Sequence, residues 1–313
     1  MKHCLVTGGA GFIGSHIARA LQQQGAAVRV LDNFSTGRRE NLAGPEARSA
    51  AGSIEVIEAD LRDQVNVAAA LRGIDLVFHQ AAFVSVPESM EKPQECLDIN
   101  VTGSLNLLEA ARKAGVQRVV IASSAAVYGD STSLPLTEDT HLRPLSPYAV
   151  SKYVDELCAD LYSRSFGLEV VALRYFNVYG PRQSLDSDYA AAVPIFIRRL
   201  LEGQAITIFG DGGQTRDLIY VGDVMRANLL AAERPGAAGH VFNVCTGRAT
   251  SILDLVEVLR AIFPGAQPPV FGPMRAGDIY ASVGQSTKAE SLLGFRAETG
   301  LADGLKATVE WMQ

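Results

Sequence analysis

Residues 3–14 read HCLVTGGAGFIG, and this stretch decides the fold of the chain. Residues 3–7 form a short apolar run typical of a strand, and the pattern of residues 15–25 predicts a helix. Glycines between a strand and a helix let the main chain turn sharply and approach a pyrophosphate, which the positive helix N-terminus attracts. A glycine run alone indicates only a turn, but this context predicts a dinucleotide-binding loop around Gly9, Gly11 and Gly14.

The next predicted strand, residues 28–31, ends in Asp32. A carboxylate at this place hydrogen-bonds an adenosine ribose and repels a 2′-phosphate, so it favours NAD over NADP. Asn33, rather than an arginine, follows and agrees with this preference. Arg38 and Arg39 lie only a few residues further along the chain and leave NADP open.

Size, composition and charge exclude several classes of protein. The chain has 313 residues, of which 48% are hydrophobic, which is ample for a large core. Its net charge of −6 argues against nucleic acid or an anionic membrane as the main partner. The chain lacks the run of about 18 apolar residues that a membrane-spanning helix needs. Removal of the first residues as a secretory signal would destroy the glycine loop.

Cysteines and histidines indicate neither a disulfide framework nor a metal site. Cys4, Cys96, Cys158 and Cys245 lack the spacing of metal ligands and suit a reducing compartment. The five histidines are scattered along the chain, without a His-x-x-x-His pair. We therefore predict a cytoplasmic protein with no metal.

Short apolar runs alternate with helical patterns through the first half of the chain. The predicted strands are 4–7, 28–31, 54–58, 76–79, 118–122 and 168–174, with helices between them that include 102–114 and 148–166. This alternation predicts an α/β fold, a Rossmann-type doubly wound parallel sheet. From about Gly180 glycines and prolines mark shorter elements, which indicate a smaller, irregular α/β C-terminal lobe.

The predicted domain boundaries follow from the end of the strand–helix alternation near Gly180. Residues 1–175 are predicted to form the dinucleotide-binding domain, to which the chain returns around 217–246. Residues 176–216 and 247–313 are predicted to form the substrate lobe. Residues 241–244 read as a strand that rejoins the first domain.

Small and polar residues follow the predicted strands, where open α/β sheets bind their ligands. They are Asp60-Leu61, Gln80-Ala81-Ala82, Asn100 and Ser123-Ser124. One elongated ligand could touch all of them, because the carboxyl ends of parallel strands lie along one edge. The small Ala81 and Ala82 would let a cofactor lie close to the main chain.

Tyr148 and Lys152 lie four residues apart in a predicted helix, so their side chains share one face. A neutral phenol is a poor base at neutral pH, and a nearby ammonium stabilises the phenolate. The spacing also occurs by chance on many helices. The Ser123-Ser124 pair, more often a turn or a helix cap, adds a second proton-handling hydroxyl near the expected nicotinamide.

Two arginines in loops of the C-terminal lobe, Arg216 and Arg275, are candidates for a bidentate clamp on a diphosphate. The plainer interpretation is a surface ion pair, for example between Arg216 and Asp217. A cleft that already holds a nicotinamide favours the clamp, because a second ligand must lie opposite it.

Together these motifs resemble the extended short-chain dehydrogenase/reductase family, in particular its nucleotide-sugar epimerases and dehydratases. The likeness covers nearly the whole chain and is carried by segments 7–14, 32–33, 60–61, 123–124, 148–152 and 174–182. It implies NAD binding in the N-terminal domain and a sugar nucleotide in the C-terminal lobe. It also implies a catalytic set of Ser124, Tyr148 and Lys152.

Motifs and resemblance together give the expected site residues. Those expected at the cofactor are Gly8, Gly11, Phe12, Ile13, Gly14, Asp32, Asn33, Ser35, Thr36, Gly37, Asp60, Leu61, Gln80, Ala81, Ala82, Asn100, Ser123, Tyr148, Lys152 and Tyr175. Those expected at the sugar nucleotide are Ser85, Ser124, Tyr148, Asn177, Thr207, Ile208, Arg216, Arg275, Asp278 and Ser282.

The residues after Ser124 narrow the reaction. The family's 4,6-dehydratases carry an acidic pair there, and its decarboxylases carry a glutamate two places on, whereas this chain has Ala125 and Ala126. Alanine cannot move a proton, so the resemblance implies reversible oxidation at one carbon. Asn177 resembles the asparagine with which hexose epimerases contact the substrate diphosphate.

The resemblance therefore implies a 4-epimerase that interconverts UDP-glucose and UDP-galactose by transient oxidation at C4 with tightly bound NAD. Ser282 aligns with a position that is often tyrosine in epimerases restricted to plain hexoses, and its small side chain leaves room for a 2-acetamido group. UDP-GlcNAc and UDP-GalNAc are therefore also expected as substrates. The alternatives are a UDP-glucuronate 4-epimerase, a nucleotide-sugar reductase or a non-catalytic NAD-binding regulator.

The resemblance also implies a homodimer. Segments 102–114 and 148–166 carry extra apolar positions, and family members usually pair the equivalent helices in a four-helix bundle.

Overall fold

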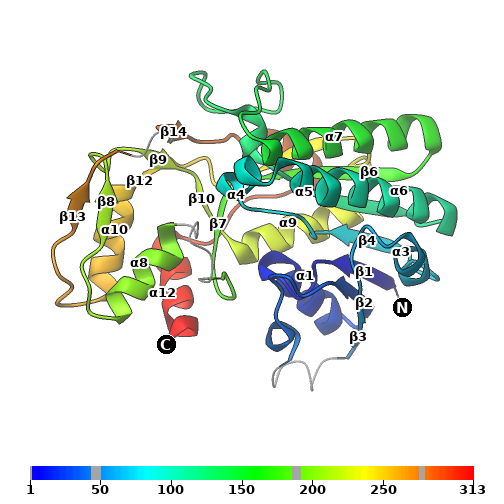
Figure 1. Cartoon of the computed structure of the whole chain (residues 1–313), viewed down its shortest axis with the longest axis horizontal. Coiled ribbons are helices and arrows are strands. Elements are labelled where there is room, and N and C mark those ends of the chain that lie inside the picture. Colours follow the sequence, from blue (N-terminus) through cyan, green and yellow to red (C-terminus); the bar gives the residue numbers. More distant parts are fainter. Residues whose placement is uncertain (1, 44–50, 185–191, 275–278) are drawn as a thin grey trace.

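The computed structural model describes residues 2–43, 51–184, 192–274 and 279–313. A sheet of seven parallel strands forms its centre, in the order β11-β6-β5-β4-β1-β2-β3 (Figure 1). The strands are β1 (His3–Thr7), β2 (Ala27–Asp32), β3 (Ser53–Glu58), β4 (Leu76–His79), β5 (Arg118–Ser124), β6 (Glu169–Tyr175) and β11 (Val241–Val244). The order reverses between β1 and β4, where doubly wound sheets bind ligands, and it confirms the predicted fold class.

Alternate residues of the strands supply two hydrophobic cores, one on each face of the sheet. Val6 packs with Ile17 of α1 (Phe12–Gln23) and Ala227 of α9 (Val221–Glu233). Leu5, pointing the opposite way, packs with Leu107 of α6 (Gly103–Ala114). Figure 1 shows α6 and α7 (Pro147–Phe166) on one side of the sheet, and α1 and α9 on the other. Near-continuous apolar strands are what a parallel sheet covered on both faces requires.

Shorter elements connect these layers along the chain. They are η1 (Arg39–Leu42), α3 (Gln64–Ala70), α4 (Val86–Glu91), α5 (Pro93–Leu97), η2 (Asp98–Thr102) and η3 (Ala125–Tyr128). Both η2 and α5 contact α7, so the crossover after β4 packs beside the helix that carries Tyr148 and Lys152.

A smaller lobe with its own core follows β6. Its strands are β7 (Asn177–Tyr179), β8 (Thr207–Phe209), β9 (Thr215–Arg216), β10 (Leu218–Tyr220), β12 (Thr250–Ser251), β13 (Val270–Gly272) and β14 (Ala281–Ser282). They pair as β10-β7, β12-β9-β14 and β13-β8. The helices α8 (Ala192–Leu201), α10 (Ile252–Ile262) and α12 (Leu301–Met312) pack on them around Ile197, Ile208, Leu255 and Leu305. Figure 1 shows this lobe to the left of the central sheet.

The chain returns to the central sheet twice after entering the smaller lobe. The strand predicted at 241–244 is β11, which pairs with β6 at the edge of the sheet. Later, α11 (Thr287–Leu293) places Ala289 and Leu293 in the core that also holds α1 and α9. Part of segment 247–313, predicted for the substrate lobe, thus packs on the first domain.

The structure differs from the prediction at two element boundaries near the sheet edge. The first helix begins at Phe12, three residues before the predicted start, because Gly14 has no Cβ and lets the first helical turn close against Gly8. The fifth strand extends to Ser124 instead of ending at 122, because main-chain pairing with β6 continues through Ser124 opposite Tyr175.

Gly14 is required by close packing rather than by its backbone angles. A Cβ at this position would lie 2.2 Å from the Gly8 carbonyl oxygen and 2.8 Å from its carbonyl carbon. Both atoms belong to the main chain, which cannot move without opening the turn. Gly8 itself has φ of +64°, which disfavours any other residue there.

We predict that Gly14→Ala lowers the free energy of unfolding by about 1–3 kcal/mol, the usual cost of overpacking. In an open helical turn, replacing glycine by alanine would instead raise the free energy of unfolding by about 1 kcal/mol. The sign of the measured change therefore distinguishes the two cases. Urea unfolding followed by circular dichroism measures the change. Gly300→Ala is a control without a main-chain clash, because its Cβ would meet only the Asp303 carboxylate at 3.3 Å, and only the cost of alanine at a helix N-cap is expected there. A Gly14→Ala variant as stable as the parent would contradict the packing argument.

Candidate active site

The carboxyl ends of the central strands form one edge on which most of the predicted residues gather. Thr7 at the end of β1 is level with His79 at the end of β4, and Ser124 is level with Tyr175. The glycine loop crosses directly onto the segment after β4, since a Cβ on Gly8 would lie 2.7 Å from the Ala81 amide nitrogen. The loop and the Ala81-Ala82 pair therefore make one continuous surface.

The start of α1 has the features of an anion-binding helix terminus. Its N-cap is Gly11, which provides no side-chain acceptor for the first-turn amides of Phe12, Ile13 and Gly14, and the first turn has no acidic residue. Such amides and the helix dipole attract a phosphate group. The Gly8–Gly14 packing keeps the turn free of side chains, so this loop fits the diphosphate of a dinucleotide.

Asp32 is nearly buried, at 6% exposure, and its carboxylate organises the loops around it. It accepts hydrogen bonds from the Ala10 amide at 2.9 Å and the Phe34 amide at 2.8 Å. Gly37 lies against it, since a Cβ there would be 2.8 Å from Oδ1. Asp32 thus fixes the relative positions of the glycine loop and segment 33–37, which includes Ser35 and Thr36.

Of the two arginines that left NADP open, Arg39 has a side chain that contacts neighbouring groups of the protein. The Arg39 guanidinium pairs with Glu58 and lies over the Phe34 ring, 4.1 Å from its centroid. The Arg38 amide donates to the Ala10 carbonyl oxygen at 2.9 Å. Asp32, in contrast, lies directly beside the glycine loop, so the acidic character of this corner agrees with NAD.

Asp60 and Leu61 follow β3 in different environments. The Asp60 carboxylate accepts from Asn33 at 3.0 Å and from Arg62 at 2.8 and 2.9 Å. The Arg62 guanidinium holds the pKa of Asp60 well below its usual range, so the group is a carboxylate at any physiological pH. Leu61 is 4% exposed and packs below Gly103, so its side chain belongs to the core.

Ser124, Tyr148 and Lys152 come from two elements that pack against one another. Ser124 ends β5, and α7 contacts both β5 and η3. The Ser124 hydroxyl oxygen accepts a hydrogen bond from the Ala126 amide at 3.1 Å. Ser146 caps α7 by accepting from the Ala149 amide, so the helix begins one turn before Lys152. Ser124 and Tyr148 are half-buried, whereas Lys152 is only 3% exposed.

A buried hydrogen-bond network supports the first turns of α7. Asn100 donates to the Ser151 hydroxyl at 2.8 Å and to the Phe83 carbonyl oxygen at 3.0 Å, and it accepts from the Phe83 amide. Ser151 in turn donates to the Tyr148 carbonyl oxygen at 2.7 Å. Asn100, expected at the cofactor, therefore fixes the segment after Ala82 to the helix that carries Tyr148.

Lys152 pairs with Asp155, a residue that the sequence did not single out. The ammonium is 3.1 Å from Oδ2, and both side chains are almost fully buried. Burial favours the neutral amine, but the charges of Asp155 and Tyr148 outweigh it and raise the pKa of Lys152. A polar residue three places after a lysine on a helix was the available signal.

A second buried ion pair locks α7 to the sheet. Glu156 forms two bonds of 2.8 Å with the Arg174 guanidinium and accepts from the Ser123 hydroxyl at 2.5 Å. Burial lowers the pKa of Arg174, but bonds to Glu156 and Tyr128 outweigh this effect and raise it. Ser123, expected at the cofactor, thus uses its side chain to join β5 to α7.

Tyr175 and Gln80 meet below the glycine loop. The Tyr175 hydroxyl donates to Asn228 of α9 at 2.9 Å and lies 3.2 Å from the Gln80 amide oxygen. Burial raises the pKa of Tyr175 far above its usual value, so the group is a neutral phenol and not a competing base. His79 is also neutral, since burial and Lys152 lower its pKa to about 3; it bonds Thr7 and Ser104.

The smaller lobe brings two of the predicted substrate residues together. Ser282 of β14 lies in register beside Arg216 of β9. Arg216 donates to the Thr215 carbonyl oxygen at 2.9 Å. Just beyond Ser282, Leu136 bonds Val283 and Gln285, which joins this strand to the segment after η3.

The other substrate predictions are more scattered. Asn177 is exposed at the start of β7, whereas Ile208 is fully buried in the lobe core and Thr207 accepts from Arg199. The Ser85 hydroxyl caps α4 by accepting from the Glu88 amide. Arg275 and Asp278 lie outside the described residues.

Asp217 is a buried junction between the lobes rather than a surface partner for Arg216. Its carboxylate accepts from the Thr246 amide and hydroxyl at 2.8 and 2.7 Å, from the Gly247 amide at 2.9 Å and from the Gly284 amide at 3.2 Å. Burial raises its pKa, and these bonds oppose the rise. This role could not be predicted from the sequence, because the partners are distant in the chain.

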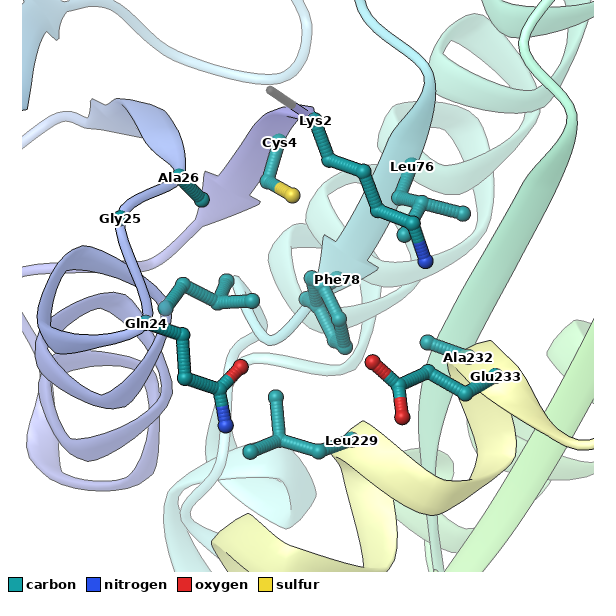
Figure 2. Close-up of a pocket in the computed structure, with 11 residues that line it drawn as sticks. Lys2, Cys4, Gln24, Gly25, Ala26, Leu76, Phe78, Leu229, Ala232 and Glu233 are labelled. Atoms are coloured by element: carbon teal, nitrogen blue, oxygen red, sulfur yellow. The ribbon is translucent and has the colours of Figure 1, made fainter. Parts of the chain in front are cut away.

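A cavity of about 190 Å³ lies away from this edge (Figure 2). It is lined by the amino ends of β1 and β4 and by the ends of α1 and α9, with Lys2 and Glu233 among its polar side chains. Figure 2 shows Phe78 and Leu229 between Gln24 on one side and Glu233 on the other. Its place at the amino ends of the strands separates it from the residues above.

Among the described residues, no cluster of three or more His, Cys, Asp or Glu side chains has a geometry that could hold a metal ion. No helix within the described part of the chain combines the length and apolarity needed to cross a membrane.

Known proteins share this fold over nearly the whole chain. The structure of UDP-glucose 4-epimerase from Thermotoga maritima with UDP-glucose superposes with a TM-score of 0.92 at 40% identity, over 99% of this chain and 98% of that one. UDP-N-acetylglucosamine 4-epimerase from Methanobrevibacter ruminantium, with UDP-N-acetylmuramic acid, gives 0.93 at 38% identity, over 99% and 98%. UDP-glucose 4-epimerase from Thermus thermophilus with NAD gives 0.88 at 39% identity, over 99% and 98%.

The family assignment rests on these likenesses and on a direct match of the sequence. Residues 4–245 match the family described as the NAD dependent epimerase/dehydratase family. This span runs from β1 through β11 and so includes the complete central sheet, the glycine loop and α7. The chain belongs to the NAD-dependent epimerase/dehydratase family.

Proposed function

We propose that the protein is an NAD-dependent UDP-hexose 4-epimerase that interconverts UDP-glucose and UDP-galactose, and also UDP-GlcNAc and UDP-GalNAc. The observation that carries the proposal is the packing of β5, which ends at Ser124, and of η3 after it against α7, the helix that carries Tyr148 and Lys152. These groups lie on the sheet edge that also carries the glycine loop. The similar proteins named above, crystallised with NAD or UDP-sugars, support the choice of cofactor and substrate class.

Tyr148 is the base of the proposed reaction. As a phenolate it takes the proton of the sugar 4-hydroxyl, and it returns that proton in the second half of the reaction. The Lys152 ammonium stabilises the phenolate across one helical turn, and Ser124 donates a hydrogen bond to the 4-oxygen. The chemistry that bound NAD supplies is reversible acceptance of the hydrogen and two electrons that leave C4.

Ala125 and Ala126 limit the outcome to this redox exchange. Both are half-buried in η3, directly after Ser124, and neither can act as an acid or a base. Elimination of water or loss of carbon dioxide needs a further proton-transfer group near the keto sugar. Without such a group, the keto sugar can only be reduced again at C4. The hydrogen can return to either face of the ring, so the product is the original sugar or its 4-epimer.

The smaller lobe holds the part of the substrate that does not react. Asn177 and Arg216 are proposed to bind the diphosphate, with the uridine near Thr207 and Ile208. The Ile208 side chain is buried, so this strand offers main-chain groups to the base. The nucleotide is bound firmly, and the hexose stays free to turn. Binding energy from the non-reacting nucleotide thereby supports the reaction at C4.

The test is proton NMR of UDP-glucose and of UDP-GlcNAc, each incubated in D₂O with the protein and no added nucleotide. We expect the 4-epimer of each sugar, with no deuterium at C4, because the transferred hydrogen never exchanges with water. Tyr148→Phe should lower turnover by at least about 100-fold, the usual effect of a lost acid–base group. Tyr162→Phe, on the same helix, is the matched control.

Four results would contradict the epimerase assignment. A need for added reductant would favour a nucleotide-sugar reductase, and turnover of UDP-glucuronate alone would favour a glucuronate 4-epimerase. NAD binding without turnover of any UDP-sugar would favour a regulator. Deuterium at C4 would show that the hydrogen passed through solvent instead of a sheltered carrier.

Ser282 is proposed to admit the 2-acetamido group. It is half-buried and adjacent to Arg216 on the neighbouring strand, so a larger side chain there would fill space beside the proposed diphosphate site. Ser282→Tyr is expected to lower kcat/KM for UDP-GlcNAc at least tenfold and to leave that for UDP-glucose within a few-fold. Ser282→Ala is the matched control. Full activity of Ser282→Tyr on UDP-GlcNAc would refute the proposal that a small residue at this position admits the 2-acetamido group.

A homodimer is proposed to form through α6 and α7. Val150, Leu157 and Leu161 are 40%, 52% and 46% exposed and share one face of α7, and Leu105 of α6 is 38% exposed. Apolar side chains gathered on neighbouring helices indicate an interaction surface. Family resemblance supports a second copy of the chain as its partner.

Light scattering coupled to gel filtration tests this interface. We expect the parent protein at micromolar concentration to have twice the chain mass of 33.4 kDa. Leu157→Asp should give the mass of one chain, because it would bury an unpaired charge. Leu253→Asp, at a leucine of similar exposure (40%) on α10, should leave the dimer intact. A monomeric parent protein would refute the proposal.

A further inference from the structure

The Lys152–Asp155 ion pair is buried at the base of the proposed catalytic site. Lys152 is 3% exposed and Asp155 is 1% exposed. The ammonium nitrogen lies 3.1 Å from Oδ2 of Asp155, one helical turn further from Tyr148. Within the described residues, Oδ1 of Asp155 has no hydrogen-bond partner. The nearby Ser104 hydroxyl already donates to the Asn100 carbonyl oxygen.

The fold gains little from an acid at this position. Removing two charges from water costs about as much as their attraction returns, and a well-packed apolar residue often serves stability as well or better. The Asp155 carboxylate also has one oxygen that accepts no hydrogen bond from the described part of the chain, which increases the cost of burying the pair. Asp155 is therefore better explained by its effect on Lys152 than by its contribution to packing.

The other ionisable groups around the pair cannot replace Asp155. On α7, Glu156 is occupied by Arg174 and Ser123, and burial raises the pKa of the Cys158 thiol. From other elements, Cys96 of α5 has its pKa raised by burial, and His79 of β4 is neutral. Tyr148 carries negative charge only when it has given up its proton. Burial raises the pKa of Asp155, and the Lys152 ammonium opposes that rise, so each member of the pair favours the charged form of the other. Among the described residues, Asp155 is the counter-charge that the ammonium contacts directly.

We propose that Asp155 is a positioning residue that acts through Lys152: its carboxylate holds the ammonium in place and charged below Tyr148 throughout the reaction. The proposal rests on the assignment of Tyr148 and Lys152 to the epimerase reaction. Tyr148 alternates between phenolate and phenol during turnover, so it stabilises the charged ammonium only while it is a phenolate. Asp155 supplies the support that does not change.

The sign of the effect follows from the causes that act on Lys152. Burial lowers the pKa of Lys152, and Asp155 is the main influence that raises it. Without the carboxylate, burial prevails, and the ammonium survives only to a lower pH. The phenolate then loses its partner at a lower pH, so the basic limb of the pH–rate profile moves in the same direction.

Lysine NMR tests the pair without requiring turnover. The chain contains only six lysines, so protein labelled with [ε-¹³C]lysine gives few signals, and Lys152→Arg identifies the one from Lys152. We expect Lys152 in Asp155→Asn to titrate at least about one pH unit below the parent, as expected for loss of an adjacent opposite charge. Asp155→Glu should restore the parent titration, and Asp155→Ser provides a second neutral variant should Asp155→Asn fold poorly.

The pH–rate profile then tests the role in turnover. The basic limb of kcat should move to lower pH in Asp155→Asn by the same amount as the lysine titration, and return in Asp155→Glu. Asp160→Asn is the matched control, because Asp160 lies on the same helix and pairs with Arg164 at the surface.

Two results would overturn the proposed role of Asp155. Both can be distinguished from a result that overturns the epimerase assignment. Coincident titration of Lys152 in the parent and both neutral variants would overturn the electrostatic role of Asp155 while leaving the epimerase assignment intact. An unmoved basic limb with reduced stability would reduce Asp155 to a structural role. A parent protein with no turnover would defeat the epimerase assignment itself, and the catalytic meaning of the pair with it.

Discussion

The bidentate bond between Glu156 and Arg174 is the constraint on which the rest of the site depends. Arg174 lies on β6, and the Ser123 hydroxyl joins the same carboxylate from β5, so two neighbouring strands hold one residue of α7. A helix held in this way cannot rotate about its axis. Removing either partner would leave a buried charge unpaired, which is costly. The rotation of α7 in turn decides that Lys152 and Asp155 face inwards.

Around this fixed helix, the two lobes have different tasks. The central sheet supplies short, rigid connections from the glycine loop, Ala81 and Ser124 to a single edge. The smaller lobe uses two- and three-residue strands, of which β9 and β14 place Arg216 and Ser282 side by side. The continuous sheet thus supports the proposed catalytic residues, and the short strands carry the residues proposed to bind the substrate.

The sequence predicted those parts of the molecule whose signals are local. The apolar strands, the glycine loop and Asp32 are each readable within a few residues, because strand burial and turn geometry act over that distance. The boundary of α1 was misplaced, because the contact that admits Gly14 to the helix depends on the exact path of the Gly8 carbonyl. Asp155, Asn228 and Asp217 were missed, since their partners come from other elements or become buried only on folding.

Asp217 has a mechanical consequence. The chain passes between the lobes near residues 217, 246 and 284, and the Asp217 carboxylate at the first of these crossings accepts hydrogen bonds from the segments at the other two. Joining three of the connecting segments at one buried point restricts sliding of the smaller lobe along the sheet more than it restricts rotation about that point. Opening and closing over a ligand would therefore be a pivoting movement, with its fulcrum at a side chain remote from the atoms that react.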